Sequence, residues 1–338
     1  MVALLGDIGG TNIRLSLLKN NEINEVSYYK TSDFSKIEEV ISLYLNKVNE
    51  TPLHFVFGVA GIVQKEVVKL TNADFEIDKA RLKALYPNTK ITLVNDFILQ
   101  GYGVLKVDEK NLRQFGPGTK DKGVQLVLGP GTGLGSCFVI PKEDGSYTIL
   151  SSEGGHASLS AITPNQQKIL AEITKDEMPV SFEDVISGSG LCRLYQAILK
   201  INQLAPDAAW LKEKEEMLQA FGVQSTMESA FIPLRPKEIT ALAEAQDEVA
   251  LLTFWYFFEF LGIYASNLAL TLKTTGGVYL VGNLLNLEAI KGLLIKSQFR
   301  KYFELKGFFS NYLKEIPIFL VEQTNIQIEG LVYLAKNV

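Results

Sequence analysis

The chain has 338 residues, of which 47% are hydrophobic and 21% charged, and its formal net charge is -5 at pH 7. This composition is typical of a soluble globular protein long enough for two domains. The negative charge argues against nucleic acid or an anionic membrane as the main partner. The two cysteines, Cys137 and Cys192, form no CxxC pair, so neither a zinc knuckle nor a disulfide framework is expected. The first residues enter a strand directly and no targeting segment is visible, so we expect a cytoplasmic protein with free thiols.

The first third of the chain alternates between strand and helix patterns. A strand at residues 2–5 leads through a glycine turn to a second strand at 15–18. The pattern then predicts a strand at 25–30, a helix at 37–48, a strand at 55–61, a helix at 79–86 and a strand at 91–94. Strands that alternate with helices predict a mixed α/β sheet.

The polar stretch at 107–122 marks the main domain boundary. After it we expect a second sheet that begins at residue 123, a mainly helical region from about 163 to 273, strands at 277–281 and 316–321, and a helix at 330–336. The most apolar stretch, 251–272, is interrupted by Glu259 and contains Asn267. It therefore predicts a buried core helix and not a membrane span.

The first glycine loop, residues 6–14, reads Gly-Asp-Ile-Gly-Gly-Thr-Asn-Ile-Arg between two apolar strands. Gly9 and Gly10 allow a tight turn whose N–H groups can approach an anion closely. Asp7 is placed to hold a cation through water, and Thr11 and Asn12 add neutral donors, a combination that suits a phosphate chain with Mg²⁺. The motif alone is equally compatible with a glycine-tipped β-hairpin.

A second glycine loop, residues 129–136, reads Gly-Pro-Gly-Thr-Gly-Leu-Gly-Ser and also lies between two predicted strands. It repeats the order of the first loop: a strand, a glycine turn that contains a threonine, and another strand. Two such loops, one at the head of each half of the chain, favour a nucleotide held from two sides over two unrelated hairpins.

Asn95 and Asp96 follow a buried strand. Ligands of open α/β sheets gather at the carboxyl ends of the strands. An aspartate there can accept a proton from a substrate hydroxyl, while the neighbouring amide binds a sugar oxygen. The same pair also suits an Asx turn or the N-cap of a helix that begins near Phe97.

A short turn, Glu153-Gly154-Gly155-His156, holds one of the two histidines of the chain. A glutamate and a histidine across a flexible turn can converge on vicinal hydroxyls, although an ordinary surface turn has the same pattern. The other histidine, His54, begins a strand and is interpreted as structural. Glu183 precedes a helical segment, where it suits helix capping as well as a ligand contact.

Together these motifs resemble the bacterial glucokinases outside the ROK (repressor, open reading frame, kinase) family, nearly end to end. The segments that carry the resemblance are 6–14, 94–97, 129–135, 153–156, 187–191, 267–270, 276–278 and 306–317; the cysteine cluster typical of the ROK zinc site is absent from the sequence. The resemblance implies an α/β protein with the two-domain actin-like ATPase (ribonuclease H-like) fold and a central interdomain cleft. The expected domains are a small α/β domain at 1–110 plus about 318–338, and a large α+β domain at 111–317.

The resemblance further implies ATP-dependent phosphorylation of glucose at its 6-hydroxyl, with Mg²⁺ as cofactor, by a homodimer. It implies that Asp96 is the general base and that the sugar is bound by Asn95, Asp96, Glu153, His156 and Glu183. The nucleotide would be bound by Gly6, Asp7, Ile8, Gly9, Gly10, Thr11, Asn12, Arg14, Gly131, Thr132, Gly133 and Gly277, and Asp7 would also hold Mg²⁺ through water.

One departure from the family pattern lies near the expected nucleoside. The family usually has a Gly-Gly pair where this chain has Gly282 and Asn283. Because asparagine tolerates a positive φ, the turn can survive, but the side chain could crowd or re-specify the adenosine pocket. Three alternatives remain: a kinase for another hexose or amino sugar, a sugar-sensing binding protein without catalysis, and, last, an actin-like filament or chaperone ATPase.

Overall fold

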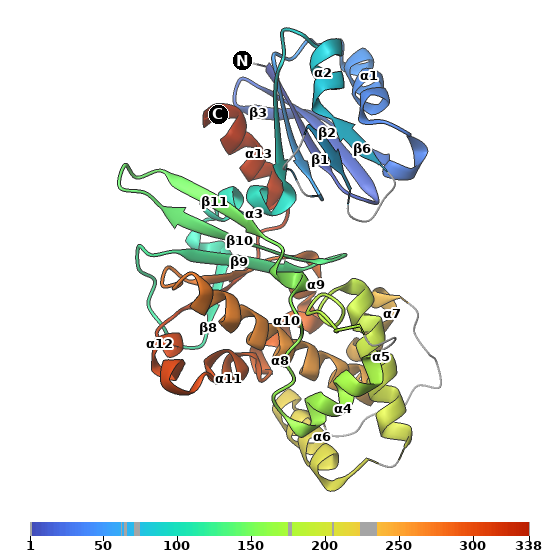
Figure 1. Ribbon diagram of the computed structural model, residues 1–338, viewed down its shortest axis with the longest axis vertical. Coiled ribbons are helices and arrows are strands. Elements are labelled where there is room, and N and C mark those ends of the chain that lie inside the picture. Colours follow the sequence, from blue (N-terminus) through green and yellow to red (C-terminus); the bar gives the residue numbers. More distant parts are fainter. Residues whose placement is uncertain are drawn as a thin grey trace. The chain divides into compact units, whose positions relative to one another are not determined.

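The computed structural model describes residues 2–61, 63, 66–70, 75–174, 178–204, 206–223 and 235–337. The chain divides into two compact units, shown in Figure 1. Unit 1 comprises Met1–Asp108, Ile149–Ser151 and Asn325–Val338; unit 2 comprises Glu109–Thr148 and Ser152–Thr324. The chain returns to unit 1 at Asn325 and not at about residue 318, because strand β13 (Ile318–Val321) pairs inside the sheet of unit 2.

Unit 1 is built on a five-stranded sheet with the order β3-β2-β1-β4-β7. Its strands are β1 (Val2–Ile8), β2 (Asn12–Lys19), β3 (Glu22–Lys30), β4 (His54–Val59) and β7 (Lys90–Asn95), with a separate pair β5 (Val67–Lys69) and β6 (Glu76–Asp78). Its helices are η1 (Thr31–Asp33), α1 (Ile37–Val48), α2 (Lys79–Leu85), α3 (Asp96–Val104) and α13 (Ile326–Asn337). Strands β1, β4 and β7 are parallel, so Ile8, Val59 and Asn95 lie side by side where these strands end.

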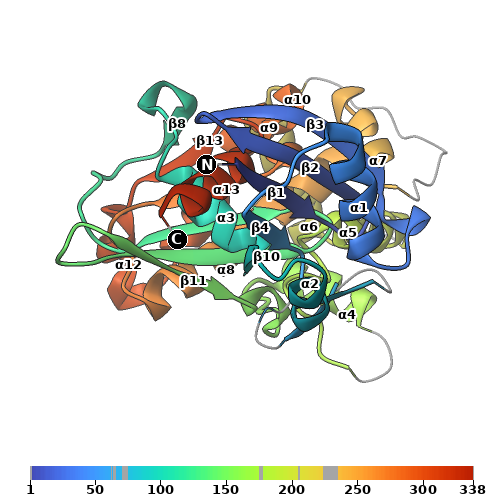
Figure 2. The ribbon, with the colours of Figure 1, turned by 90° about the horizontal axis from the view of Figure 1, so that it is seen from above.

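Successive side chains of a strand point to opposite faces, so β1 feeds two separate cores. Leu4 and Ile8 belong to the core that contains α1, whereas Ala3 and Leu5 belong to the core that contains α3 and α13. Accordingly, α1 and α13 lie on opposite faces of the sheet (Figures 1 and 2).

Helices α3 and α13 pack unusually closely because a glycine of each faces the backbone of the other. A Cβ atom at Gly103 would collide with the carbonyl oxygen of Ile326, and one at Gly330 would collide with that of Leu99. The Tyr102 and Tyr333 rings stack beside this contact, with centroids 4.7 Å apart. The C-terminal helix therefore supports the helix that begins at Asp96.

Unit 2 contains a six-stranded sheet with the order β11-β10-β9-β12-β13-β8. Its strands are β8 (Leu112–Phe115), β9 (Gln125–Pro130), β10 (Leu134–Pro141), β11 (Tyr147–Ser152), β12 (Val278–Leu280) and β13. The sequence did not predict β8, which lies in the polar stretch assigned to the boundary. Only Phe115 of its four residues is buried, so no alternating apolar pattern marks it.

The helices of unit 2 surround one long central helix, α8 (Glu248–Thr271). The others are η2 (Glu109–Asn111), η3 (Gly154–His156), α4 (Pro164–Ile173), α5 (Gly188–Gln203), α6 (Ala208–Phe221), α7 (Pro236–Glu244), α9 (Asn283–Asn286), α10 (Glu288–Lys296), α11 (Phe299–Glu304), η4 (Gly307–Phe309) and α12 (Ser310–Lys314). By length and composition α8 could cross a membrane, but its most apolar stretch is 100% buried inside the protein. It is the core helix that the sequence predicted.

Candidate active site

The first glycine loop leaves the sheet of unit 1 at the end of β1. Its turn is tight, because the Gly9 N–H donates to the Asn12 carbonyl at 3.0 Å and the Thr31 hydroxyl donates to the Gly9 carbonyl at 2.7 Å. Two other residues assigned to nucleotide binding, Gly6 and Ile8, lie in β1 just before the turn. The Ile8 side chain is fully buried in the core and a Cβ atom at Gly6 would lie 2.6 Å from the Phe57 ring, so core packing restricts both positions.

The tip of this loop offers backbone donors. Within the described residues, the N–H groups of Gly10 and Thr11 have no protein acceptor. Thr11 and Asn12 are exposed, so this part of the loop is open to solvent. Adjacent unpaired N–H groups in a turn form an anion-binding concavity.

Asp7 and Arg14 face each other across β1 and β2, and their side chains form an ion pair of 3.0 Å. Arg14 also donates to the Asn325 side chain at 3.1 Å, which ties the loop to the start of α13. Burial raises the pKa of the Asp7 carboxyl above its ordinary value, and the charge and hydrogen bond of Arg14 offset this only in part. A cation beside the second carboxylate oxygen would stabilise the ionised form further.

The Asp7 carboxylate and the neighbouring N–H groups of the loop suit a Mg²⁺ ion that is bound together with a phosphate group. No group of three or more histidine, cysteine, aspartate or glutamate side chains gathers in the described part of the chain. Mg²⁺ commonly keeps several waters and uses one or two carboxylates together with substrate phosphates. A single carboxylate beside a phosphate-binding turn meets that requirement.

Asn95 and Asp96 lie at the end of β7, at the same edge of the sheet. Asn95 is the N-cap of α3: its side-chain oxygen accepts from the Phe97 N–H at 2.9 Å and its NH₂ donates to the Gly61 carbonyl at 3.1 Å. The Asp96 carboxylate also accepts from the Phe97 N–H at 2.9 Å. Strand β4 separates Asn95 from Ile8, which corresponds to two strand spacings, or about 10 Å. The predicted base and the first glycine loop thus share one edge of unit 1.

The second glycine loop joins β9 to β10 in unit 2. The Gly131 N–H donates to the Gly133 carbonyl, and the Gly131 carbonyl accepts from the Gly188 N–H, both at 2.8 Å. Within the described residues, no protein acceptor faces the N–H groups of Thr132 and Gly133. This loop therefore presents two adjacent backbone donors, like the first one.

The sugar-binding candidates of unit 2 come from two adjoining segments. Glu153 precedes η3 and His156 is its last residue, and the Glu183 N–H donates to the Gly155 carbonyl at 2.8 Å. The Glu183 carboxylate lies 3.9 Å from His156 Nδ1. All three side chains are at least partly exposed, so they can reach a ligand.

Tyr264 of α8 is a neighbour that the sequence did not reveal. Its hydroxyl shares a hydrogen bond of 3.0 Å with Ser136. Burial raises the pKa of Tyr264, and the negative charges of Glu153 and Glu183 raise it further. Its place in a largely apolar helix gave no sign that it lies within reach of the charges of two carboxylates.

The structure corrects the expectation for Gly277 and Asn283. Gly277 lies buried against Phe319 at the start of β12, whereas the second glycine loop follows the end of β9, which is parallel to β12. It is Gly282, after the end of β12, that approaches the loop, since a Cβ atom there would lie 3.0 Å from the Pro130 carbonyl oxygen. Gly282 also takes the positive φ of this turn (122°), while Asn283 begins α9 and is exposed.

The N-cap of α5 supports the second loop. The Ser187 hydroxyl accepts from the Gly190 N–H at 3.0 Å, next to the Gly188 N–H that holds Gly131. We expect Ser187→Ala to lower the free energy of unfolding by about 1 kcal/mol, the usual loss for an N-cap. Urea denaturation measures it, and Ser160→Ala, at an exposed serine outside the helices and strands, is the control expected to change stability by less than about 0.5 kcal/mol. Equal losses in the two variants would contradict the capping role.

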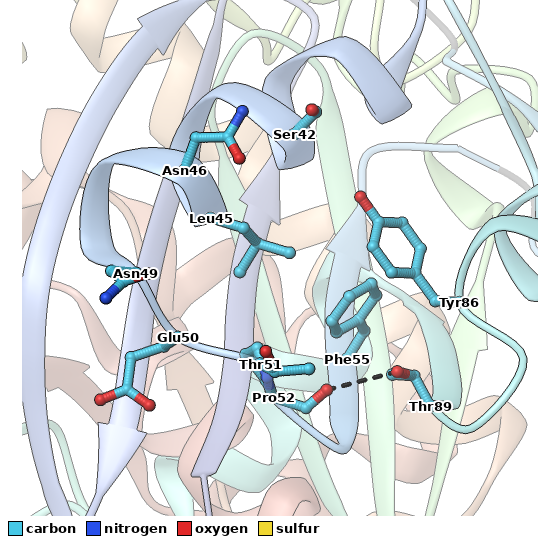
Figure 3. Close-up of a pocket in the computed structure, with 10 residues that line it drawn as sticks. All are labelled: Ser42, Leu45, Asn46, Asn49, Glu50, Thr51, Pro52, Phe55, Tyr86 and Thr89. Carbon is cyan, nitrogen blue, oxygen red and sulfur yellow. Dashed lines mark hydrogen bonds between the residues drawn. The ribbon is translucent and has the colours of Figure 1, made fainter.

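A hollow of about 430 Å³ lies elsewhere in unit 1 (Figure 3). It is lined by the end of α1, the loop that leads to β4, and Tyr86 and Thr89 before β7. Thr89 closes its floor with a hydrogen bond of 3.3 Å to the Pro52 carbonyl. These residues lie where β4 and β7 begin, at the edge opposite to Asn95, so the hollow is separate from the candidate site.

Comparison with known proteins gives consistent matches along the whole chain. The profile of the glucokinase family matches residues 4–338. A glucokinase from Nitrobacter hamburgensis is 31% identical over 336 residues, which are 98% of this chain and 96% of that protein.

Solved structures match over similar lengths. A glucokinase from an Antarctic psychrotroph has a TM-score of 0.77 and 29% identity, and the match covers 100% of this chain and 99% of that one. A ROK-family glucokinase from Streptomyces griseus, in complex with glucose and AMPPNP, has a TM-score of 0.62 and 17% identity over 100% of both chains. The fold is the actin-like ATPase fold of these sugar kinases, as predicted.

Proposed function

The chain belongs to the glucokinase family and phosphorylates glucose with ATP, and we propose that Asp96 is the general base of this reaction. In the proposed mechanism the Asp96 carboxylate accepts the proton of the sugar 6-hydroxyl as the oxygen attacks the γ-phosphoryl group. Asn95, Glu153, His156 and Glu183 bind the other hydroxyls and hold the 6-hydroxyl toward Asp96.

The single observation that carries this proposal is the pair of glycine loops, each with two adjacent N–H groups that no protein acceptor in the described ranges satisfies. These four N–H groups lie on exposed or partly exposed residues, so they are accessible to a ligand, and adjacent unpaired N–H groups in a turn suit an anion. The triphosphate of ATP is such a ligand. Phosphoryl transfer depends mostly on positioning and charge neutralisation, which these donors and Arg14 supply.

Asp7 is the proposed ligand of Mg²⁺, through water. The ion would supply neutralisation of the charge on the phosphate oxygens. The ion pair with Arg14 leaves one Asp7 carboxylate oxygen for this role. We also propose that the protein works in the cytoplasm and forms a homodimer.

Glucose-dependent release of ADP, followed with a coupled assay, tests the function. We expect turnover with glucose, ATP and Mg²⁺, and its loss when EDTA removes the metal. Mannose, fructose and glucosamine in the same assay test the choice of sugar, and another sugar as the best substrate would overturn the glucose assignment. If glucose binds but no ADP forms with any sugar, the chain is a sugar-binding protein without catalysis.

A further inference from the structure

The Glu183 carboxylate contacts two segments with different proposed ligands. Its Oε1 lies 3.9 Å from His156 Nδ1, in the sugar-binding set. Its Oε2 accepts a hydrogen bond of 2.7 Å from the backbone N–H of Leu134. Leu134 is the first residue of β10 and directly follows residues 131–133 of the second glycine loop. One side chain therefore touches the segments assigned to sugar and to nucleotide.

The backbone of the second glycine loop lies close to this carboxylate. A Cβ atom at Gly133 would lie 2.6 Å from Glu183 Oε2, so a side chain at this position would collide with the carboxylate. The backbone of Glu183 is itself anchored on the sugar-binding turn, through its N–H bond of 2.8 Å to the Gly155 carbonyl. The side chain thus links the turn at Gly155 to the loop at Gly133.

Few other bonds hold the loop in the described part of the chain. The Gly188 N–H fixes the Gly131 carbonyl at one end, and the Gly131 N–H bonds to the Gly133 carbonyl within the loop. At the other end, the side-chain contact recorded is the one from Leu134 to Glu183. Leu134 is buried and is paired with Pro130 in the β9–β10 ladder, so loss of the Glu183 bond would free the N–H next to Gly133 while the strand itself stays in place.

We propose that Glu183, besides binding sugar, is a positioning residue for the nucleotide: it holds the Leu134 N–H and so keeps the donors of Thr132 and Gly133 in place for the phosphates. This proposal rests on the proposed function. It adds that sugar and nucleotide binding are coupled through one carboxylate. A sugar hydroxyl that donates to Glu183 would reduce the negative charge felt by a phosphate at the adjacent loop, which favours binding of both ligands together.

Two uncharged variants separate positioning from charge. Glu183→Ala removes the acceptor of the Leu134 N–H, whereas Glu183→Gln retains a carbonyl oxygen that can accept it. Both lose the carboxylate, so repulsion of the phosphates is equally absent. We expect AMPPNP, measured by calorimetry with Mg²⁺ and no sugar, to bind Glu183→Ala about three- to tenfold more weakly than Glu183→Gln. The bond that Glu183→Gln retains joins neutral groups, and the loss of one such bond corresponds to a change of this size.

His156→Ala is the matched control, because it removes a sugar-binding candidate that makes no recorded bond to the loop. We expect it to weaken glucose binding and to leave AMPPNP affinity within about twofold of the unaltered protein, since the contact to Leu134 remains. Equal AMPPNP affinity of Glu183→Ala and Glu183→Gln would overturn the proposal.

A spectroscopic measurement on the unaltered protein covers the case in which a variant fails to fold. The amide resonance of Leu134 should lie downfield because its acceptor is charged, and glucose should shift it. A Leu134 resonance that glucose leaves unmoved would overturn the coupling. None of these binding measurements requires turnover. If AMPPNP binds but glucose is not phosphorylated, only the proposed function is overturned. If the protein is an active kinase but Glu183→Ala and Glu183→Gln bind AMPPNP equally well, only the present inference is overturned.

Discussion

Replacement of Asp96 by asparagine is expected to lower kcat for glucose phosphorylation by about 10²- to 10⁴-fold, the usual contribution of a positioned general base. Asparagine has the same shape, and its side-chain oxygen can still accept the Phe97 N–H that Asp96 holds at 2.9 Å. The start of α3 therefore stays intact while the proton acceptor is lost. Initial rates from the coupled ADP assay at saturating glucose and ATP measure the effect.

Asp78→Asn is the matched control for this experiment. Asp78 also stands at the start of a helix of unit 1, where it accepts from the Arg81 N–H at 3.0 Å, but it is assigned no role in the reaction. We expect its kcat to remain within about twofold of the unaltered enzyme. A similar kcat in Asp96→Asn, in a protein with unchanged thermal stability, would remove Asp96 from its proposed role.

The second large effect concerns Glu259, a fully buried glutamate of α8. Its Oε2 accepts from the Gln166 NH₂ at 2.7 Å, and its other contacts are the Glu213 carboxylate and the Tyr302 hydroxyl. Burial raises the pKa of Glu259 well above its ordinary value, and the charge of Glu213 raises it further. Glu259 Oε1 is buried without a hydrogen-bond partner among the described residues, an environment that disfavours a negative charge on this carboxyl.

The surrounding hydrogen bonds fix where the donors point. The Gln166 side-chain oxygen is occupied by the Ile162 N–H at 2.9 Å, so its NH₂ must face Glu259. Glu213 accepts from Asn165 at 2.6 Å and from the Tyr256 hydroxyl at 3.0 Å. These hydrogen-bonded side chains link α4, α6, α8 and α11. A proton on Glu259 removes the repulsion between its carboxylate and that of Glu213.

We expect the stabilisation that this proton provides to be lost as the pH rises. Since the folded-state pKa of Glu259 is raised, the folded protein retains a proton that the unfolded chain loses near 4.5. Relative to Glu259→Gln, whose amide can donate without titrating, the unaltered protein should lose about 1.4 kcal/mol of unfolding free energy per pH unit between that value and the raised pKa. Urea denaturation of both proteins at several pH values between 5 and 8 measures this slope.

Glu215→Gln serves as the control, because Glu215 is an exposed residue of the same helix as Glu213. Its difference from the unaltered protein should not change with pH. If the difference for Glu259→Gln were also constant from pH 5 to 8, Glu259 would be ionised in the folded protein. The prediction that it holds a proton there would then be wrong.

Much of the fold could be predicted from local pattern. The amphipathic spacing of residues 37–48 predicted α1 with the bounds that the structure gives, and the apolar run after residue 250 predicted a buried helix. Strand β8 was not predicted, because this polar edge strand has no alternating apolar pattern. Helix α13 begins at Ile326, four residues before the predicted start, since residues 326–329 already form its first turn.

Parts of the candidate site could not be predicted from the sequence. These are the contacts made by a backbone atom or by a residue far away along the chain. The glycine loops and the Asn95-Asp96 pair were visible because residue type and position after a strand carry the signal. The bond from the Leu134 N–H to Glu183 was not visible, because any residue at 134 has that N–H. Gly277 was assigned by motif, but strand direction places Gly282 beside the loop. Likewise, the sequence showed Glu259 in an apolar helix but not the neighbouring Glu213, whose charge helps to raise its pKa.

The close packing of α13 against α3 bears on how the protein is made. The face of the sheet formed by Ala3 and Leu5 is covered by Leu331 and Leu334 of α13, which the ribosome produces only after all of unit 2. Domains generally fold as units during synthesis. Unit 2 is continuous apart from a three-residue excursion and can complete its core first, while the early strands wait with one apolar face open. In a growing chain, the part translated first is therefore the last to be finished, and it is the part that a chaperone would need to shield.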